Sequence, residues 1–257
     1  MVDLHRSLVI SCDSYYYSLA YDLGIDNIHN FISQFGLGQK TGIDIEGEEL
    51  GLLPSQEWKL KRFKEKWFAG DTVSVGVGQG YNLVTPLQLA HATAILATNG
   101  IAFRPRLVRY IQDSKTNQLQ TIPSEVLYSL NFKPANLDLI RKALIDVTGP
   151  DGTAARAGAN SAYPIAGKTG TAQVIALKQN EKYTENRVNE RQQDHALFIA
   201  YAPADNPQIA LAVLVENGGH GSATAAPLAR QVLDFYLLGK RPQSAIPARD
   251  DKQEAND

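Results

Sequence analysis

The stretch YPIAGKTGTAQV, residues 163–174, decides how the rest of the chain is interpreted. It has the apolar content of a buried strand, yet it carries a charge at Lys168 and a glycine at Gly170. Glycine weakens a strand interior unless another group must approach the backbone closely. Lys168 could simply be a solvent-facing charge on an edge strand. Alternatively, Lys168, Thr169 and Thr171 form a ledge that binds a carboxylate or an added peptide strand.

The composition indicates an ordinary globular protein. The chain has 257 residues, of which 44% are hydrophobic and 20% charged, and its formal net charge is −2. This length suffices for one large domain or two small ones. The charge gives no electrostatic reason to expect a nucleic-acid partner. The single cysteine, Cys12, excludes an internal disulfide, and no apolar run approaches the roughly 18 residues of a transmembrane helix.

Helical patterns dominate residues 1–150. Apolar spacing and capping residues predict helices over residues 14–24, 26–36, 55–63, 85–100 and 136–149. The expected N-caps are Asp26, Ser55, Thr85 and Asn136. Pro86 would lie in the first turn of its helix, where the missing N–H is harmless. A loop over residues 36–54 and a strand over residues 102–111 complete this region.

Residues 151–239 have a different pattern. Strands are expected around Lys168 and over residues 195–203 and 208–217, and a helix over residues 224–239 closes the region. Helices followed by a three-strand meander and a helix predict an α+β fold with an antiparallel sheet. The polar residues 240–257 are expected to form a disordered tail.

A second candidate segment, SCDS, lies at the start of the first predicted helix. Asp13 or Ser14 would serve well as the N-cap, which is a purely structural role. The functional alternative makes Ser11 a proton relay and lets Asp13 orient it or contact a substrate.

Two further segments are ambiguous. GVGQGYN, residues 76–82, is rich in glycine, but it lacks the strand-to-helix setting and the acidic partner of a nucleotide site. KLKRFKEKW, residues 59–67, reads as a solvated helix face, with a contact to anionic glycan or lipid headgroups as the alternative.

Taken together, Ser-x-Asp and the later Lys-Thr-Gly-Thr are two of the three motifs of penicillin-reactive serine acyltransferases. The segments FGLGQKTGIDIEGE, GDTVSVGVGQGYNLVTPLQLAHATAILATNG and HALFIAYAP resemble the class B penicillin-binding proteins, the D,D-transpeptidases of bacterial cell walls. EWKLKRFKEKWFAGDT and the Ser-x-Asp form are similar to the elongation-specific penicillin-binding protein 2 group of Gram-negative bacteria. The resemblance runs from about residue 4 to residue 238. It implies the penicillin-binding, serine β-lactamase-like transpeptidase fold, with residues 1–239 as its C-terminal part.

In that family, a serine of a Ser-x-x-Lys motif attacks the D-Ala-D-Ala end of a stem peptide or the ring of a β-lactam. The resemblance implies that Ser11 shuttles protons. It also implies that Asp13 stands where most relatives have an asparagine that contacts substrate, although an aspartate lacks the amide donor.

The resemblance assigns the remaining roles to one strand. Lys168 would supply positive potential, and the hydroxyls of Thr169 and Thr171 would hold the substrate carboxylate. The Thr171 N–H would form half of the oxyanion hole, and Gly170 would let the acyl group lie close to the strand.

The chain departs from the family in one respect. No serine in it is followed by a lysine three positions later. We therefore expect the nucleophile, two strands of a five-stranded sheet and a membrane anchor to lie outside this chain, which alone would be inactive. An open apolar groove and an unpaired strand edge would then make it poorly stable or prone to association.

No cofactor is expected. Some relatives use a cysteine at the place of Cys12 in a metal site, but the partner ligands would lie upstream, and Cys12 with His5 alone falls short of the usual four ligands. The resemblance implies as partners peptidoglycan stem peptides, β-lactam antibiotics, a membrane glycan polymerase and elongation-complex proteins, but no nucleic acid. The expected location is the periplasmic face of the bacterial inner membrane. A non-catalytic fragment or binding module is the alternative. A penicillin-recognising β-lactamase or sensor domain is less favoured, because the segment GDTVSVGVGQGYNLVTPLQLA resembles the transpeptidases.

Overall fold

A three-stranded antiparallel sheet forms the centre of the computed structural model, which describes residues 2–174 and 193–241. Its strands, in spatial order, are β5 (Ala166–Ala172), β6 (His195–Ala202) and β7 (Ile209–Val215). The predicted meander is confirmed. The register pairs Lys168 with Ile199, and Gly167 is needed there because a Cβ atom would lie 2.5 Å from the ring of Phe198.

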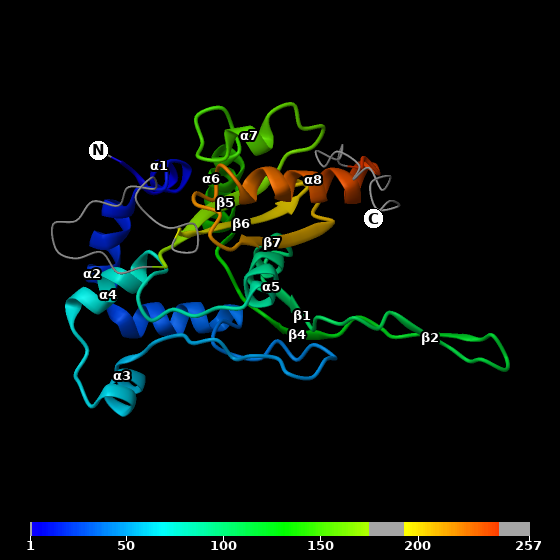
Figure 1. The fold of residues 1–257 in the computed structure, drawn as a ribbon, viewed down its shortest axis with the longest axis horizontal. Helices are drawn as coiled ribbons and strands as arrows, with labels where there is room; N and C mark the ends of the chain where they lie inside the picture. Colours follow the sequence, from blue (N-terminus) through cyan, green and yellow to red (C-terminus); the bar gives the residue numbers. More distant parts are fainter. Residues whose placement is uncertain (1, 175–192, 242–257) are drawn as a thin grey trace, which may run out of the picture.

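Helices cover both faces of this sheet (Figure 1). On one face, α8 (Ala225–Leu238) packs on β6 and β7, and α5 (Pro86–Ala97) packs on the same two strands from the other face. The α8 side buries Phe198 and Leu233 in the main core cluster. The opposite side buries Tyr201, and α6 (Pro134–Val147) packs on β5. Phe198 and Tyr201 point to opposite faces because successive side chains alternate along a strand, and β6 is buried on both faces.

A third core cluster lies among the helices beside the sheet. It forms where α2 (Asp13–Ile32) packs on α4 (Ala69–Gly76), with Ala20, Ile28 and Val75 buried between them. The remaining helical elements are α1 (Leu4–Val9), η1 (Ser33–Phe35), α3 (Gln56–Phe63) and α7 (Ala155–Gly158).

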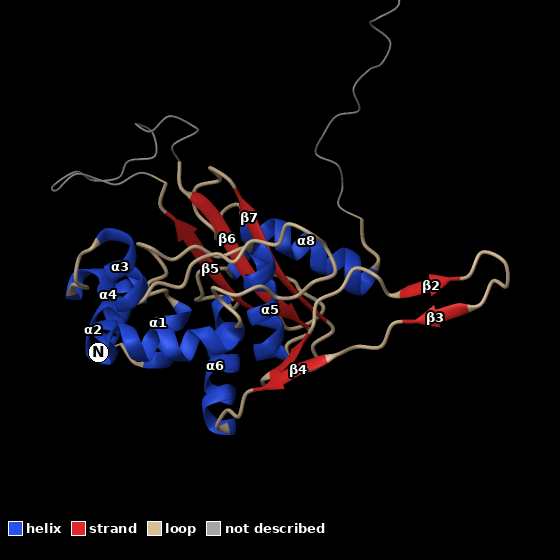
Figure 2. Ribbon diagram, turned by 90° about the horizontal axis from the view of Figure 1, so that it is seen from below, coloured by secondary structure: helices blue, strands red, loops and turns tan. Residues whose placement is uncertain are grey.

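The strand predicted over residues 102–111 is wrong as a continuous element. The structure has β1 (Ile101–Phe103) paired with β4 (Val126–Ser129), and β2 (Tyr110–Gln112) paired with β3 (Leu119–Thr121). Pro105 lies in the interruption, where it lacks an N–H for a ladder. The β2–β3 hairpin extends away from the body of the molecule (Figure 2).

The break predicted between the helices over residues 14–24 and 26–36 is confirmed, because Gly24 inside α2 is non-helical (φ 74°, ψ 156°) and two helices meet there at a kink. Other boundaries are corrected, since α2 ends at Ile32 and η1 continues to Phe35. The N-cap of α2 is Cys12 rather than Asp13 or Ser14. The role of Asp26 as the N-cap after the kink stays a prediction.

α6 begins three residues earlier than the predicted N-cap, Asn136, implies. Lys133 is its N-cap and Pro134 its first residue, so Asn136 lies inside the helix. Proline suits the first helical position because the N–H that it lacks has no partner there.

Two predicted caps are confirmed. The Ser55 side chain accepts a hydrogen bond from the Trp58 N–H at 3.1 Å. Thr85 forms a reciprocal capping box with Gln88, and Pro86 opens α5. Of the predicted polar tail, residues 242–257 lie outside the described residues. Among the helices of the described ranges, none combines the length and apolar content needed to cross a bilayer.

Candidate active-site cleft

A cleft of about 650 Å³ lies between the start of α2, the region around α4 and one edge of β5. All six predicted site residues line it: Ser11, Asp13, Lys168, Thr169, Gly170 and Thr171. The fold therefore brings together two motifs that are far apart in the sequence.

The centre of the cleft is a contact between Lys168 and Ser11. The Lys168 Nζ donates hydrogen bonds to the Ser11 Oγ at 2.8 Å and to the Thr169 carbonyl oxygen at 3.0 Å, so residues 157 positions apart meet here. Burial of the ammonium group lowers the pKa of Lys168 to about 8, and the negative charge of Asp13 acts in the opposite direction. An amine with this pKa can gain or release a proton near neutral pH.

Ser11 occupies a strained turn between α1 and α2. Its φ is 54°, in the left-handed region, which for a residue other than glycine costs roughly 1–2 kcal/mol. The turn is closed by a hydrogen bond from the Cys12 N–H to the Ser7 carbonyl at 2.9 Å. Such strain is typical of positions that a functional site holds in place.

Asp13 is the first residue of α2 and is exposed. A carboxylate is favourable at this position because the N-terminal end of a helix carries partial positive charge. Its side chain lines the cleft, and its contact with a substrate stays a prediction.

The outer edge of β5, with which no strand pairs in the part of the chain that the structure describes, faces the cleft; we call it the free edge. The N–H and C=O of one strand residue point to the same edge. The carbonyls of Thr169 and Thr171 accept hydrogen bonds from the side chains of Lys168 and Gln79, not from β6. The Thr171 N–H therefore also points to this edge, which is the direction that a role in an oxyanion hole requires.

Gly170 is less constrained than Gly167. A Cβ atom at Gly170 would lie 3.3 Å from the Leu197 Cβ, which is its nearest neighbour among the residues that the structure describes. Packing within the sheet does not by itself demand glycine here, so the role of Gly170 in admitting an acyl group stays a prediction.

The structure adds residues that were not predicted. The Thr153 hydroxyl lies 3.0 Å from the Thr169 hydroxyl, and Gly221 packs so closely on the Gly170 backbone that any Cβ would clash. Gln79 bonds to β5 through its side-chain amide. The glycines are the visible pattern of residues 76–82, which contain Gln79. A single side chain that bonds to a strand edge produces no periodic pattern in the sequence.

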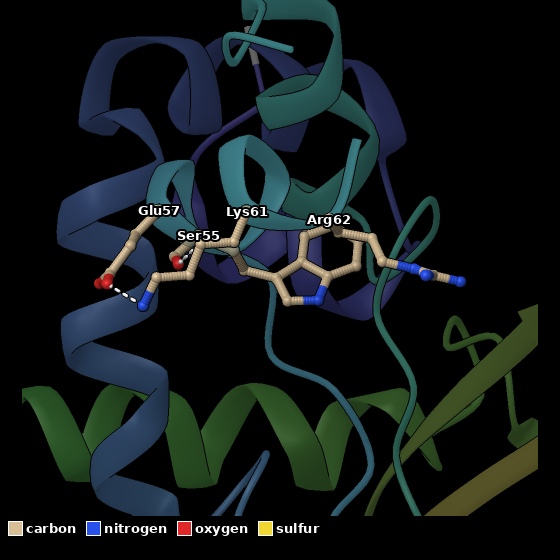
Figure 3. Close-up of a pocket in the computed structure, with 5 residues that line it drawn as sticks. Ser55, Glu57, Lys61 and Arg62 are labelled. Atoms are coloured by element: carbon tan, nitrogen blue, oxygen red, sulfur yellow. Dashed lines mark hydrogen bonds and ion pairs between the residues drawn. The ribbon is translucent and has the colours of Figure 1, made fainter. Parts of the chain in front are cut away.

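A shallower cavity of about 500 Å³ lies on the surface of α3, lined by Ser55, Glu57, Trp58, Lys61 and Arg62 (Figure 3). Glu57 and Lys61 form an exposed ion pair at 2.5 Å, and Arg62 points to the opposite side. None of the predicted site residues lines this cavity.

The solvated face predicted for residues 59–67 is corrected at Lys59. That side chain is 3% exposed and bonds to Asp71 at 2.5 Å, which joins α3 to α4. Over the described ranges, no cluster of three or more His, Cys, Asp or Glu side chains is arranged to hold a metal ion.

Comparison with known proteins gives consistent matches. The model of the penicillin-binding protein transpeptidase domain matches residues 1–234. Peptidoglycan D,D-transpeptidase MrdA of Haemophilus influenzae is 44% identical over 244 residues, which cover 94% of this chain and 37% of that protein. The protein of the same name from Escherichia coli K12 is 41% identical, with 93% and 37% covered. The chain thus spans about 37% of the length of these curated relatives.

Solved structures agree with these matches. A Pseudomonas aeruginosa PBP2 structure in complex with WCK 5153 superposes with a TM-score of 0.79 at 42% identity, covering 96% of this chain and 50% of that one. A Helicobacter pylori complex between PBP2 and MreC gives a TM-score of 0.76 at 31% identity, covering 92% and 40%.

Proposed function

The chain belongs to the penicillin-binding protein transpeptidase family, and from this premise we propose that it forms part of a D,D-transpeptidase that cross-links peptidoglycan stem peptides during cell-wall elongation. Its fold is the expected α+β transpeptidase fold, of which it contains only a part. The observation that supports the proposal most directly is the 2.8 Å contact between Lys168 and Ser11 beside the free edge of β5.

The proposed mechanism is acyl transfer through a serine ester. A serine outside this chain attacks the carbonyl of a D-Ala-D-Ala bond or of a β-lactam ring, and the leaving amine takes up a proton. The Thr171 N–H stabilises the negative charge that develops on the carbonyl oxygen. Ser11 passes the proton, because its hydroxyl bonds to an ammonium whose pKa of about 8 permits transfer near neutrality.

The same strand recognises the substrate. The hydroxyls of Thr169 and Thr171 and the charge on Lys168 bind the terminal carboxylate of the stem peptide or β-lactam, because all three line the cleft. Gly170 has no side chain, so the acyl group can lie close to the strand beside them.

We further propose that this polypeptide alone forms no stable acyl-enzyme, because no serine in it has a lysine three positions later. Labelling with a fluorescent penicillin followed by mass spectrometry tests both statements. The longest reading frame that includes this chain should be labelled on a serine of a Ser-x-x-Lys motif, and the chain alone should not. An adduct on any serine of this chain would contradict the second statement, and an unlabelled longer protein would favour a non-catalytic binding module.

Partners and location are proposed on the same basis. The Helicobacter pylori relative was solved with MreC, and another related structure, 28% identical, is described as a peptidoglycan synthase complex that coordinates polymerization and crosslinking. We propose a comparable elongation-complex protein and a membrane glycan polymerase as partners, β-lactam antibiotics as ligands, and the periplasmic face of the inner membrane as the location. Co-purification of the longer protein from membranes tests these assignments.

A further inference from the structure

Gln79 bonds to the free edge of β5 through both ends of its side-chain amide. Its Nε2 donates to the Thr171 carbonyl at 2.7 Å, and its Oε1 accepts from the Gln173 N–H at 3.4 Å. An added strand would offer a donor and an acceptor to these same two backbone groups. The Gln79 amide therefore takes the place of a peptide group from a neighbouring strand.

The backbone around Gln79 is built to hold it there. Gly78 and Gly80 flank it with φ of +78° and +70°, values that favour glycine. The Gln79 N–H bonds to the Ser74 carbonyl at 3.0 Å, and its carbonyl accepts from the Asn82 Nδ2 at 3.4 Å. The side chain is half-buried and lines the cleft.

A peptide that binds along this edge meets groups that are already engaged. Lys168 holds the Thr169 carbonyl, and Gln79 holds the Thr171 carbonyl and the Gln173 N–H. An amide N–H of a ligand lying along this edge would approach the Thr171 carbonyl from the direction that the Gln79 Nε2 already occupies, so the two donors compete for that position. A ligand with no such N–H has no need to displace Gln79.

We propose that Gln79 is an internal competitor for the amide-binding position of the cleft, and thereby a specificity-determining residue for acyl donors. This inference rests on the proposed function, because it assumes that acyl donors bind along β5. Ligands that present an amide N–H to the Thr171 carbonyl replace the bond that Gln79 gives up. When such a ligand binds, the bond from its N–H to the Thr171 carbonyl replaces the bond from Gln79. The total number of hydrogen bonds to this carbonyl therefore does not increase.

The test compares two β-lactams on the longest reading frame that includes this chain. Benzylpenicillin has an acylamino N–H, and a penam carboxylate without an acylamino group does not. Replacing Gln79 by alanine should raise the second-order acylation rate constant for benzylpenicillin roughly three- to tenfold, the equivalent of about one net hydrogen bond. The rate constant for the penam should stay within about twofold. Gln112→Ala, an exposed glutamine on the β2–β3 hairpin, should change neither.

The opposite outcomes are clear. If Gln79→Ala changes both rate constants by the same factor, or lowers both, Gln79 only stabilises the end of β5 and the inference is wrong. Should Gln79→Ala fail to fold, Gln79→Asn replaces it, because one methylene fewer prevents the amide from reaching both backbone groups. If the wild-type protein is not acylated by benzylpenicillin at all, the proposed function fails, and this inference fails with it.

Discussion

β5 and β7 flank the same central strand and both have seven residues, but their sequences have little in common. β7 reads IALAVLV and packs its side chains into the core beneath α8. β5 reads AGKTGTA, and the carbonyls along its outer edge bond to the side chains of Lys168 and Gln79. One outer strand contributes packing, while the other presents its backbone to a cleft.

The difference is also visible within β5 itself. Its first residues are buried, and Ile165 just before it accepts a hydrogen bond from the Thr148 hydroxyl at 2.8 Å. From Lys168 onward the strand is only half-buried. Stability is therefore concentrated at the start of the strand, which leaves the remainder available for a ligand.

The largest expected effect is at Lys168. Replacing Lys168 by methionine in the longest reading frame should lower the rate of acylation by penicillin about 10²–10³-fold, because it removes a preorganised charge. The free energy of unfolding should nevertheless rise by about 1–3 kcal/mol at pH 7, because burial opposes the charged form and lowers its pKa to about 8. Labelling kinetics and urea unfolding measure the two quantities. Lys115→Met on the exposed hairpin is the control and should label like the wild type. If Lys168→Met is also labelled at the wild-type rate, the functional distinction between β5 and β7 is wrong.

The reciprocal experiment is on β7. Leu211 packs against the main core, so Leu211→Ala should lower the free energy of unfolding by about 1–2 kcal/mol. Acylation should not change at temperatures where the variant is folded. The exposed Leu214, which is 40% accessible, supplies the control, since Leu214→Ala should change stability by about 0.5 kcal/mol or less. A loss of acylation in folded Leu211→Ala would show that the two strands are coupled.

A pH titration sharpens the contrast further. The ammonium of Lys168 attracts a carboxylate and loses its proton as the pH rises through about 8. Affinity for a carboxylate-bearing β-lactam should therefore fall by up to about tenfold between pH 7 and pH 9. Stability should move in the opposite direction, rising between about pH 8 and 10.5, because the unfolded chain binds the proton more tightly. Stopped-flow binding and thermal melts across this range check both, and a flat affinity profile would exclude Lys168 as the carboxylate partner.

The smallest effect is expected at the outer edge of β7. Within the described ranges no strand pairs with this edge, and exposed strand edges promote association between chains. Leu214→Lys should lower the association of the isolated chain a few-fold because the charge opposes edge-to-edge pairing. Sedimentation velocity over a concentration series measures this change, with Leu214→Ala as the neutral comparison. If Leu214→Lys and Leu214→Ala associate equally, the chains associate through a surface other than the outer edge of β7.

Elements whose signals are local could be predicted from the sequence. α5 is an example, because Thr85 and Pro86 mark its start within two residues. α4 could not be predicted, since its glycines and β-branched residues are weak helix formers. It is helical because Val75 is buried against α2 and Gly76 packs on Ala20.

The site was predictable only in part for the same reason. Ser11 and Lys168 were singled out by their motifs, but their 2.8 Å contact depends on how α1 and α2 pack near β5. Thr153 and Gln79 carry no motif of their own. Their roles follow from the direction in which β5 presents its hydroxyl and carbonyl groups.

The left-handed conformation of Ser11 has a practical consequence for protein engineering. Glycine adopts this conformation without the steric penalty of a side chain, so Ser11→Gly would relieve the strain in this turn. That variant lacks the hydroxyl that meets Lys168. Relief of backbone strain and loss of this hydroxyl would then result from the same substitution, and only an activity assay run beside the stability measurement would reveal the loss.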